Sequence, residues 1–216
     1  MVQIAIDGPA GAGKSTVAKA LAERLGILLL DTGAMYRAFA LMAIRQDIMP
    51  EEHPDSVWDR LFDGFKLDFA GQRTFLNGED ISDEIRAPYV EAVVSQFSAF
   101  RHVRSRMVAL QQEIAAGRPV VMEGRDIGTV VLKDSPNKFY LSASEEVRAQ
   151  RRHLQNLQKG LESDLDSVKE LMHKRDTSDM NKEVGQLVAS PESIYIDSSE
   201  KTVDEVVEAI ISQLVI

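Results

Sequence analysis

Short, largely apolar runs alternate along the chain with longer segments in which apolar residues recur every three or four positions. Runs with the length of a buried strand lie at residues 4–6, 27–30, 119–122, 138–141 and 193–196. Apolar strands separated by helical segments are typical of a parallel sheet covered by helices. The pattern therefore predicts an α/β fold with a five-stranded parallel sheet and helices on both of its faces.

The period of the pattern changes at residues 65–81. Phe65, Leu67 and Phe69 alternate with polar residues, which is the pattern of a half-exposed strand. Asn77–Gly78 provides the turn chemistry of a two-residue hairpin, because both residue types tolerate positive φ. We therefore expect a small antiparallel sheet here, inserted into an otherwise alternating β/α chain.

Residues that favour helix ends mark several boundaries. Thr32 is a suitable N-cap for the helix after the second apolar run. Ser142 with Glu145, and Thr202 with Glu205, have the spacing of a capping box. We therefore expect helices to begin directly after Thr32, Ser142 and Thr202. Residues 88–116 read as two further helices.

The composition narrows the class of protein. The chain has 216 residues, with 25 lysines and arginines against 34 aspartates and glutamates, for a net charge of −9. Such an acidic chain is a poor candidate for holding a nucleic-acid polymer along its surface. The absence of cysteine excludes disulfides, thiolate metal sites and cysteine nucleophiles. The apolar runs are too short to span a membrane and no signal peptide is visible, so we expect a cytoplasmic protein.

One stretch carries a recognisable chemistry. Residues 8–15 read G-P-A-G-A-G-K-S, and they fit the phosphate-loop pattern G-x-x-x-x-G-K-[ST] between a strand and a helix. The glycines let the backbone wrap around an anion, Lys14 places a charge on the β- and γ-phosphates, and the Ser15 hydroxyl binds Mg²⁺. The residues expected to contact ATP are Gly8, Pro9, Ala10, Gly11, Ala12, Gly13, Lys14, Ser15 and Thr16.

Charged residues also follow two other predicted strands. Arg37 comes after the second apolar run, and Glu123 and Arg125 come at the end of the third. Ligands of an open parallel sheet bind beyond the carboxyl ends of its strands, so these side chains are expected near the phosphate loop. Glu123 resembles a Walker B acid, which would hold Mg²⁺ through water, and Arg125 would clamp a phosphate with two hydrogen bonds.

A cluster of arginines lies on the helix that follows the fourth strand. Arg148, Arg151 and Arg152 are spaced so that Arg148 lies near both of the others. Crowded like charges indicate a bound anion, and phosphoryl transfer requires cations around the migrating group. The alternative is a solvated basic face that is paired with nearby glutamates.

Six segments together resemble bacterial cytidylate kinases, which are P-loop nucleoside monophosphate kinases. The segments are IDGPAGAGKST, LLDTGAMYRA, SQFSAFRHVR, MEGRDIGTVV, SEEVRAQRR and RDTSDMNKE. The phosphate loop alone indicates a large superfamily, whereas DTGAMYR and GRDIGTVV are far more selective. The resemblance extends from the first strand to the last helix. It implies Mg²⁺-dependent phosphoryl transfer from ATP to CMP or dCMP, giving ADP and CDP or dCDP, and we expect a monomer.

The resemblance also implies roles for individual residues. The implied CMP contacts are Thr32, Tyr36, Arg37, Ser95, Arg104, Arg125, Asp126, Arg175, Asp179 and Lys182. Arg37, Arg125 and Lys182 would hold the phosphate, with Lys182 at a position where the family often has arginine. Ser95, Arg104 and Asp126 would read the cytosine, whose N4 amino group donates to a carboxylate. Lys14, Arg148 and Arg152 would be the catalytic cations.

The same resemblance implies a division of the chain. We expect one nucleoside monophosphate kinase domain over residues 1–216, with a CMP-binding subdomain of residues 32–99 inserted into it. Residues 148–185 are expected to form a mobile lid, since much of this segment is polar and charged. The remaining residues, 1–31, 100–147 and 186–216, would form the core.

Two alternatives remain open at this stage. A small P-loop kinase could act on a sugar, on shikimate or on another nucleotide, although a neutral acceptor would leave the phosphate-clamping residues without a partner. A nucleotide-switched binding module such as a GTPase is a second possibility, because Asn181-Lys182-Glu183-Val184 mimics the start of a guanine-reading N-K-x-D motif. The final acid of that motif is missing.

Overall fold

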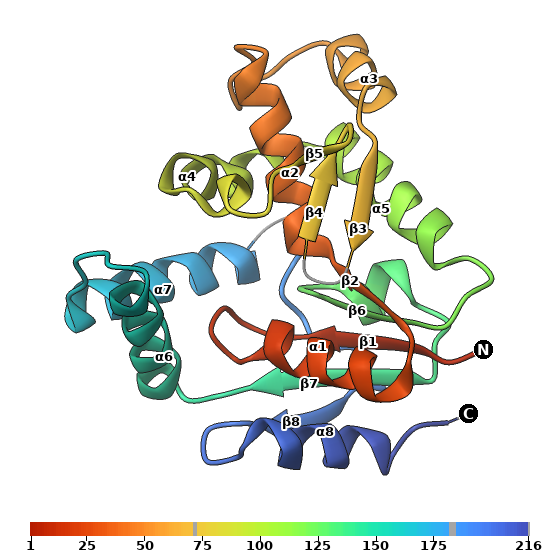
Figure 1. Cartoon of the computed structure of the whole chain (residues 1–216), viewed down its shortest axis with the longest axis vertical. Coiled ribbons are helices and arrows are strands. Elements are labelled where there is room, and N and C mark those ends of the chain that lie inside the picture. Colours follow the sequence, from red (N-terminus) through yellow and green to blue (C-terminus); the bar gives the residue numbers. More distant parts are fainter. Residues whose placement is uncertain (71–72, 182–184, 216) are drawn as a thin grey trace. The chain divides into compact units, whose positions relative to one another are not determined.

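A five-stranded sheet organises most of the chain in the computed structural model, which describes residues 1–70, 73–181 and 185–215 (Figure 1). Its strand order is β2-β6-β1-β7-β8, and β1 pairs in parallel with both β6 and β7, as β7 does with β8. The strands are β1 Gln3–Asp7, β2 Leu28–Asp31, β6 Val120–Gly124, β7 Asn137–Ser142 and β8 Ile194–Asp197. All five predicted strands are present, so the expected α/β fold is confirmed.

The chain divides into two compact units, which we describe separately. The larger unit contains residues 1–30 and 115–216, and the smaller unit contains residues 31–114. Helices of the larger unit are α1 Lys14–Leu25, α6 Glu145–Gln158, α7 Leu165–Asn181 and α8 Val203–Ile211, with a π-helix at Ile127–Val131. Helices of the smaller unit are α2 Thr32–Arg45, α3 Asp55–Asp63, α4 Pro88–Phe97 and α5 Arg101–Ala115, with a 3₁₀ turn at Glu84–Arg86.

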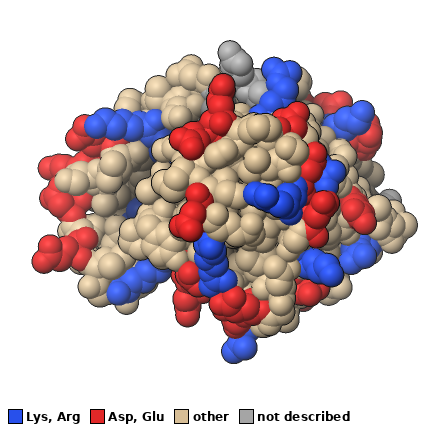
Figure 2. Space-filling view, turned by 90° about the horizontal axis from the view of Figure 1, so that it is seen from above, with Lys and Arg blue, Asp and Glu red and all other residues tan. Residues whose placement is uncertain are grey.

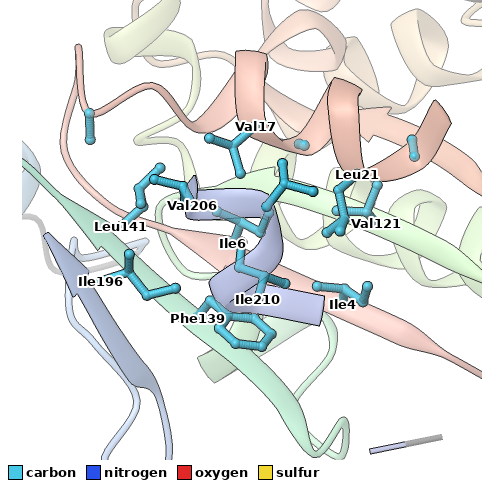
Figure 3. Close-up of a cluster of buried hydrophobic side chains, with 14 residues drawn as sticks. Ile4, Ile6, Val17, Leu21, Val121, Phe139, Leu141, Ile196, Val206 and Ile210 are labelled. Atoms are coloured by element: carbon cyan, nitrogen blue, oxygen red, sulfur yellow. The ribbon is translucent and has the colours of Figure 1, made fainter. Parts of the chain in front are cut away.

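The core of the larger unit lies between the sheet and two helices. Val17 and Leu21 of α1 pack with Val206 of α8 against the apolar side chains of β1 and β7, including Ile6 and Phe139 (Figure 3). All of these side chains are at most 2% exposed. Burial of this surface fixes α1 against β1, and with it the loop that joins them.

The smaller unit has an aromatic core. Phe39 lies at its centre and contacts the rings of Trp58, Phe62, Phe65 and Phe97 at centroid distances of 4.6 to 6.4 Å. Offset and edge-to-face contacts of this kind stabilise aromatic clusters beyond the burial of their area. This cluster holds α2, α3 and α4 together.

The predicted antiparallel sheet is also present in the smaller unit. Its order is β3-β4-β5, formed by the strands Leu67–Ala70, Arg73–Leu76 and Glu79–Asp80. Asn77 and Gly78 have φ values of 53° and 85°, as a two-residue turn with two left-handed residues requires. The hairpin signal in the sequence was therefore correct.

Two predicted helix caps were wrong by one or two residues. The side chain of Asp31, not that of Thr32, accepts the hydrogen bond from the Ala34 N–H, because the helix already begins at Thr32. Strand β7 extends through Ser142, so the cap of α6 moves to Ser144. The capping box of Thr202 with Glu205 is confirmed.

The surface carries mixed charge. On the face shown in Figure 2, lysine and arginine side chains are interspersed with aspartate and glutamate side chains. Within the described ranges, no helix combines the length and the apolar character needed to cross a membrane.

Candidate active site

The phosphate loop connects β1 to α1 through three glycines with positive φ. Gly8, Gly11 and Gly13 have φ values of 148°, 77° and 91°. Gly13 is the N-cap residue of α1 and brings no side chain to cap the first N–H groups of the helix. A helix start of this kind provides oriented N–H donors and a positive partial charge for an anion. The loop therefore has the conformation that its sequence predicted.

Neighbouring elements press closely on this loop. A Cβ atom on Gly8 would lie 2.0 Å from the carbonyl oxygen of Leu141 on β7. A Cβ atom on Gly11 would lie 2.9 Å from Met172 Cε and 3.0 Å from Arg148 Cβ. Only glycine fits at these two positions, for reasons of both space and φ. The loop is thus a preformed cradle whose shape β7, α6 and α7 maintain.

Lys14 lies at the base of the cradle. Its side chain is buried, and Nζ donates a hydrogen bond to the Pro9 carbonyl at 2.8 Å. The pKa of Lys14 is lowered to about 7, first by burial and then by the nearby charge of Arg125, against the opposing influence of Glu123 and Asp7. An incoming polyphosphate would favour the charged form, so Lys14 is positioned to gain a proton as it binds an anion.

Two oxygen groups that could hold a divalent cation meet beside Lys14. The Ser15 hydroxyl donates a hydrogen bond to Oε1 of Glu123, although the two residues are 108 positions apart. Glu123 is the last residue but one of β6 and pairs in register with Ile6 of β1, the strand that leads into the phosphate loop and α1. Mg²⁺ prefers hard oxygen ligands such as a hydroxyl and a carboxylate. The donor set therefore fits the ion that the sequence predicted.

Arg125 and Asp126 follow directly in the turn after β6. Arg125 Nε donates to Oδ2 of Asp179 at 3.0 Å, and its Nη1 donates to the Gly8 carbonyl at 3.3 Å. Asp126 is 6% exposed. The turn is therefore held against the phosphate loop on one side and against α7 on the other.

The arginines of α6 have different environments. Arg148 is buried, forms an ion pair with Asp176 of α7, and donates to the Ala10 carbonyl of the phosphate loop at 3.1 Å. Arg152 is half-buried. Helices α6 and α7 lie side by side (Figure 1). Arg148 thus connects this helix pair to the phosphate loop.

Arg151 contributes to a brace on the phosphate loop. Its Nη1 donates to Oγ of Ser198 at 3.1 Å, and Ser198 Oγ in turn donates to the Ala12 carbonyl at 2.9 Å. Ser198 is buried and follows β8. The chain of hydrogen bonds connects α6 and the segment after β8 to the backbone of the phosphate loop at Ala12.

Three further predicted residues lie on α7 or just beyond it. Arg175 is exposed, whereas Asp179 is 4% exposed and holds Arg125. The positive charge of Arg175 also lowers the pKa of Lys14. Lys182 lies outside the described residues.

The smaller unit holds the other predicted CMP residues. Arg37 Nη2 donates to Oδ2 of Asp31 at 3.2 Å, but its buried Nε has no hydrogen-bond partner among residues 1–70, 73–181 and 185–215. A buried guanidinium with an unsatisfied donor is costly unless an anion completes it. Arg104 is 7% exposed and donates to Tyr36 Oη at 3.3 Å. Thr32 on α2 is buried, and Ser95 on α4 is half-buried.

Comparison with known proteins assigns the family. The family model described as cytidylate kinase matches residues 4–215. The chain belongs to the cytidylate kinase family. Among curated relatives, the cytidylate kinase of Symbiobacterium thermophilum is 50% identical over 213 residues, covering 96% of this chain and 93% of that protein. The cytidylate kinase of Caldanaerobacter subterraneus subsp. tengcongensis is 47% identical over 209 residues, covering 97% and 92%.

Solved structures agree at the level of the fold. A crystal structure of an uncharacterized protein from Eubacterium ventriosum has a TM-score of 0.54 and 17% identity, covering 98% of this chain and 97% of that one. At that identity the likeness concerns the fold alone. The family assignment confirms the resemblance seen in the sequence. It also rules out the GTPase alternative. Residues 182–184 of the motif considered for that alternative lie outside the described residues.

The sequence reasoning assigned no function to two residues that contact this candidate site. Asp7 accepts a hydrogen bond from the start of the π-helix, and Ser198 donates one to the phosphate loop. Arg151, which the sequence placed in the arginine cluster, donates to Ser198. Asp7 carried a signal, because it stands directly before the first glycine of the loop at the end of a buried strand. Ser198 carried none, because its contact with Ala12 spans 186 positions.

Proposed function

We propose that this protein transfers the γ-phosphoryl group of ATP to CMP or dCMP, giving ADP and CDP or dCDP. One observation carries the proposal: a phosphate loop with a buried Lys14, and a Ser15–Glu123 pair beside it, within a cytidylate kinase chain. In the transfer, a phosphate oxygen of the monophosphate forms a bond to the γ-phosphorus. The bond from that phosphorus to the β,γ-bridging oxygen breaks, and ADP leaves with the electron pair.

On the donor side, the phosphate loop would bind ATP. The N–H groups at the start of α1 and the ammonium group of Lys14 would neutralise the β- and γ-phosphates. Ser15 would ligate Mg²⁺ directly, and Glu123 would do so through water. When bound, Mg²⁺ supplies charge neutralisation between the β- and γ-phosphates.

On the acceptor side, we assign the CMP phosphate to Arg37, Arg125 and Lys182. The support in the smaller unit is the buried Nε of Arg37, which has no hydrogen-bond partner within the described part of the chain. In the larger unit it is the position of Arg125 beside the Gly8 carbonyl. A dianionic phosphate offers these guanidinium groups the charge-assisted, two-point contacts that they favour.

The base and the ribose would be read by separate sets. Cytosine donates from N4 and accepts at O2 and N3, so we assign N4 to Asp126 and the acceptors to Arg104, with Ser95 beside them. Uracil reverses the pattern at positions 3 and 4, which should cost on the order of 1–3 kcal/mol. Arg175 and Asp179 would contact the ribose, and Thr32 and Tyr36 would line the pocket.

Residues 148–185 would act as a lid that closes on ATP. The contact of Arg148 with the Ala10 carbonyl supports this role, because it places this arginine of α6 at the phosphate loop. Phosphates that arrive beside Ala10 would offer Arg148 a second anionic partner. Arg148 and Arg152 would then stabilise the charge of the migrating group. We further propose that the enzyme works as a monomer in the cytoplasm.

The test is a coupled assay of ADP release from MgATP with CMP, dCMP, UMP, AMP, GMP and shikimate as separate acceptors. We expect the highest kcat/KM with CMP or dCMP and a much lower value with UMP. Lys14→Ala should lower turnover by several orders of magnitude while its circular dichroism spectrum stays that of the wild type. Near-normal turnover of Lys14→Ala, or activity with shikimate and none with CMP, would refute the proposal.

A further inference from the structure

The carboxylate of Asp7 binds a backbone segment that is far away in the sequence. Its Oδ1 accepts from the Ile127 N–H and its Oδ2 accepts from the Gly128 N–H, both at 2.7 Å. Asp7 is 1% exposed. These are two charge-assisted hydrogen bonds from one buried carboxylate to two consecutive peptide groups. The carboxylate therefore fixes both the position and the orientation of the start of the π-helix.

A second contact connects the same two segments, and here the segment after β6 supplies the side chain. Arg125 Nη1 donates to the carbonyl of Gly8, the residue after Asp7. The end of β1 thus contributes a carboxylate to these contacts, and the turn after β6 contributes a guanidinium group. Because β1 and β6 are neighbours in register, with Asp7 opposite Gly124, the two turns leave the sheet side by side.

Gly128 leaves little room for this segment to shift. A Cβ atom there would lie 3.2 Å from Lys138 Cγ and 3.3 Å from Asp7 Oδ2. Lys138 is itself 4% exposed and forms an ion pair with Glu192, so its side chain has little freedom to move. The peptide at Gly128 is held between β1 and β7. Short π-helical turns are frequently found at functional sites.

We infer that Asp7 is a positioning residue for the acceptor nucleotide: it holds the 127–128 peptides so that Arg125 and Asp126 are presented to CMP. The inference rests on the CMP-binding role proposed above for those two residues. Asp7 itself touches neither nucleotide in this scheme. Its effect on CMP passes through the backbone, whereas its negative charge also acts on Lys14 and hence on the ATP side.

Two variants separate these effects. Asp7→Asn removes the charge and turns an NH₂ group towards one of the two N–H donors. Gly128→Ala keeps the charge and crowds the same peptide against Lys138 Cγ and Asp7 Oδ2. Ser135→Ala is the matched control, because it removes a buried hydrogen bond to Gln3 at the other end of β1. The measurements are KM for CMP, KM for ATP and kcat for each variant.

We expect both test variants to raise KM for CMP about tenfold, the scale of a lost hydrogen bond to a charged group. KM for ATP should change less than KM for CMP in Gly128→Ala, and Ser135→Ala should change neither. If Gly128→Ala leaves KM for CMP unchanged, the inference is wrong. It is also wrong if Asp7→Asn changes only KM for ATP, since Asp7 then acts on Lys14 alone. If Asp7→Asn does not fold, Gly128→Ala decides the question.

Arg125→Ala tests the underlying site assignment separately. If this variant leaves KM for CMP unchanged, the assignment of Arg125 to the CMP phosphate fails. Asp7→Asn and Gly128→Ala still report whether the 127–128 segment determines CMP binding. If Arg125→Ala raises KM for CMP and Gly128→Ala does not, the site assignment stands and the role of Asp7 is refuted.

Discussion

Asp7 should make the stability of the folded protein depend on pH in a calculable way. The pKa of its carboxyl group is raised from 3.8 to about 6, and burial is the largest cause. The N–H groups of Gly128 and Ile127 lower the pKa, the negative charge of Asp126 raises it, and Lys14 lowers it. Burial outweighs the hydrogen bonds, so an ionised Asp7 costs the folded protein free energy at neutral pH.

The magnitude follows from proton linkage. Asp7 in the unfolded chain releases its proton near pH 3.8, but in the folded protein it does so near pH 6. Between these values the folded state binds more protons, so the free energy of unfolding falls as the pH rises. At 1.36 kcal/mol per pKa unit, the contribution is about 3 kcal/mol. It is fully present below pH 3.8 and is lost as the pH rises through 6.

Asp7→Asn provides the measurement, because asparagine keeps the size of the side chain and does not titrate. Urea unfolding of both proteins at dilute concentration from pH 4 to 7.5 gives their free energies of unfolding at each pH. The difference, wild type minus variant, should fall by about 2 to 3 kcal/mol over this range. A difference that is constant, or that increases with pH, would refute the reasoning.

Two further predictions concern the phosphate loop. Gly8→Ala should abolish ATP binding in a calorimetric titration, because the new Cβ would lie 2.0 Å from the Leu141 carbonyl oxygen. The control is Gly117→Ala, because Gly117 also has a positive φ but has no described atom within 4 Å of the new Cβ. Normal ATP affinity of Gly8→Ala would contradict the close packing. Ser198→Ala should raise KM for ATP about five- to tenfold and leave KM for CMP unchanged, because it releases the Ala12 carbonyl. Equal changes in both KM values would show that Ser198 has only a general structural role.

Local features of the fold were legible in the sequence. The five apolar runs, the Asn77–Gly78 turn and the Thr202–Glu205 capping box each depend on residues only a few positions apart. The phosphate loop belongs with them, because its glycines, Lys14 and Ser15 form one continuous motif between a strand and a helix. The predicted caps of α2 and α6 were wrong because the exact end of a strand depends on its neighbours in the sheet: Ser142 still belongs to β7 and pairs with Asp197 of β8.

The sequence by itself therefore determined the fold class, the phosphate loop and, through its resemblance, the family. The tertiary structure decided which distant charges meet: Asp7 with the peptides at 127–128, Ser15 with Glu123, and Arg148 with Asp176. The first of these contacts spans 120 positions. The first two contacts arise because β1 lies beside β6, and the third because α6 packs against α7. Strand order is set by burial of the whole sheet rather than by any short motif.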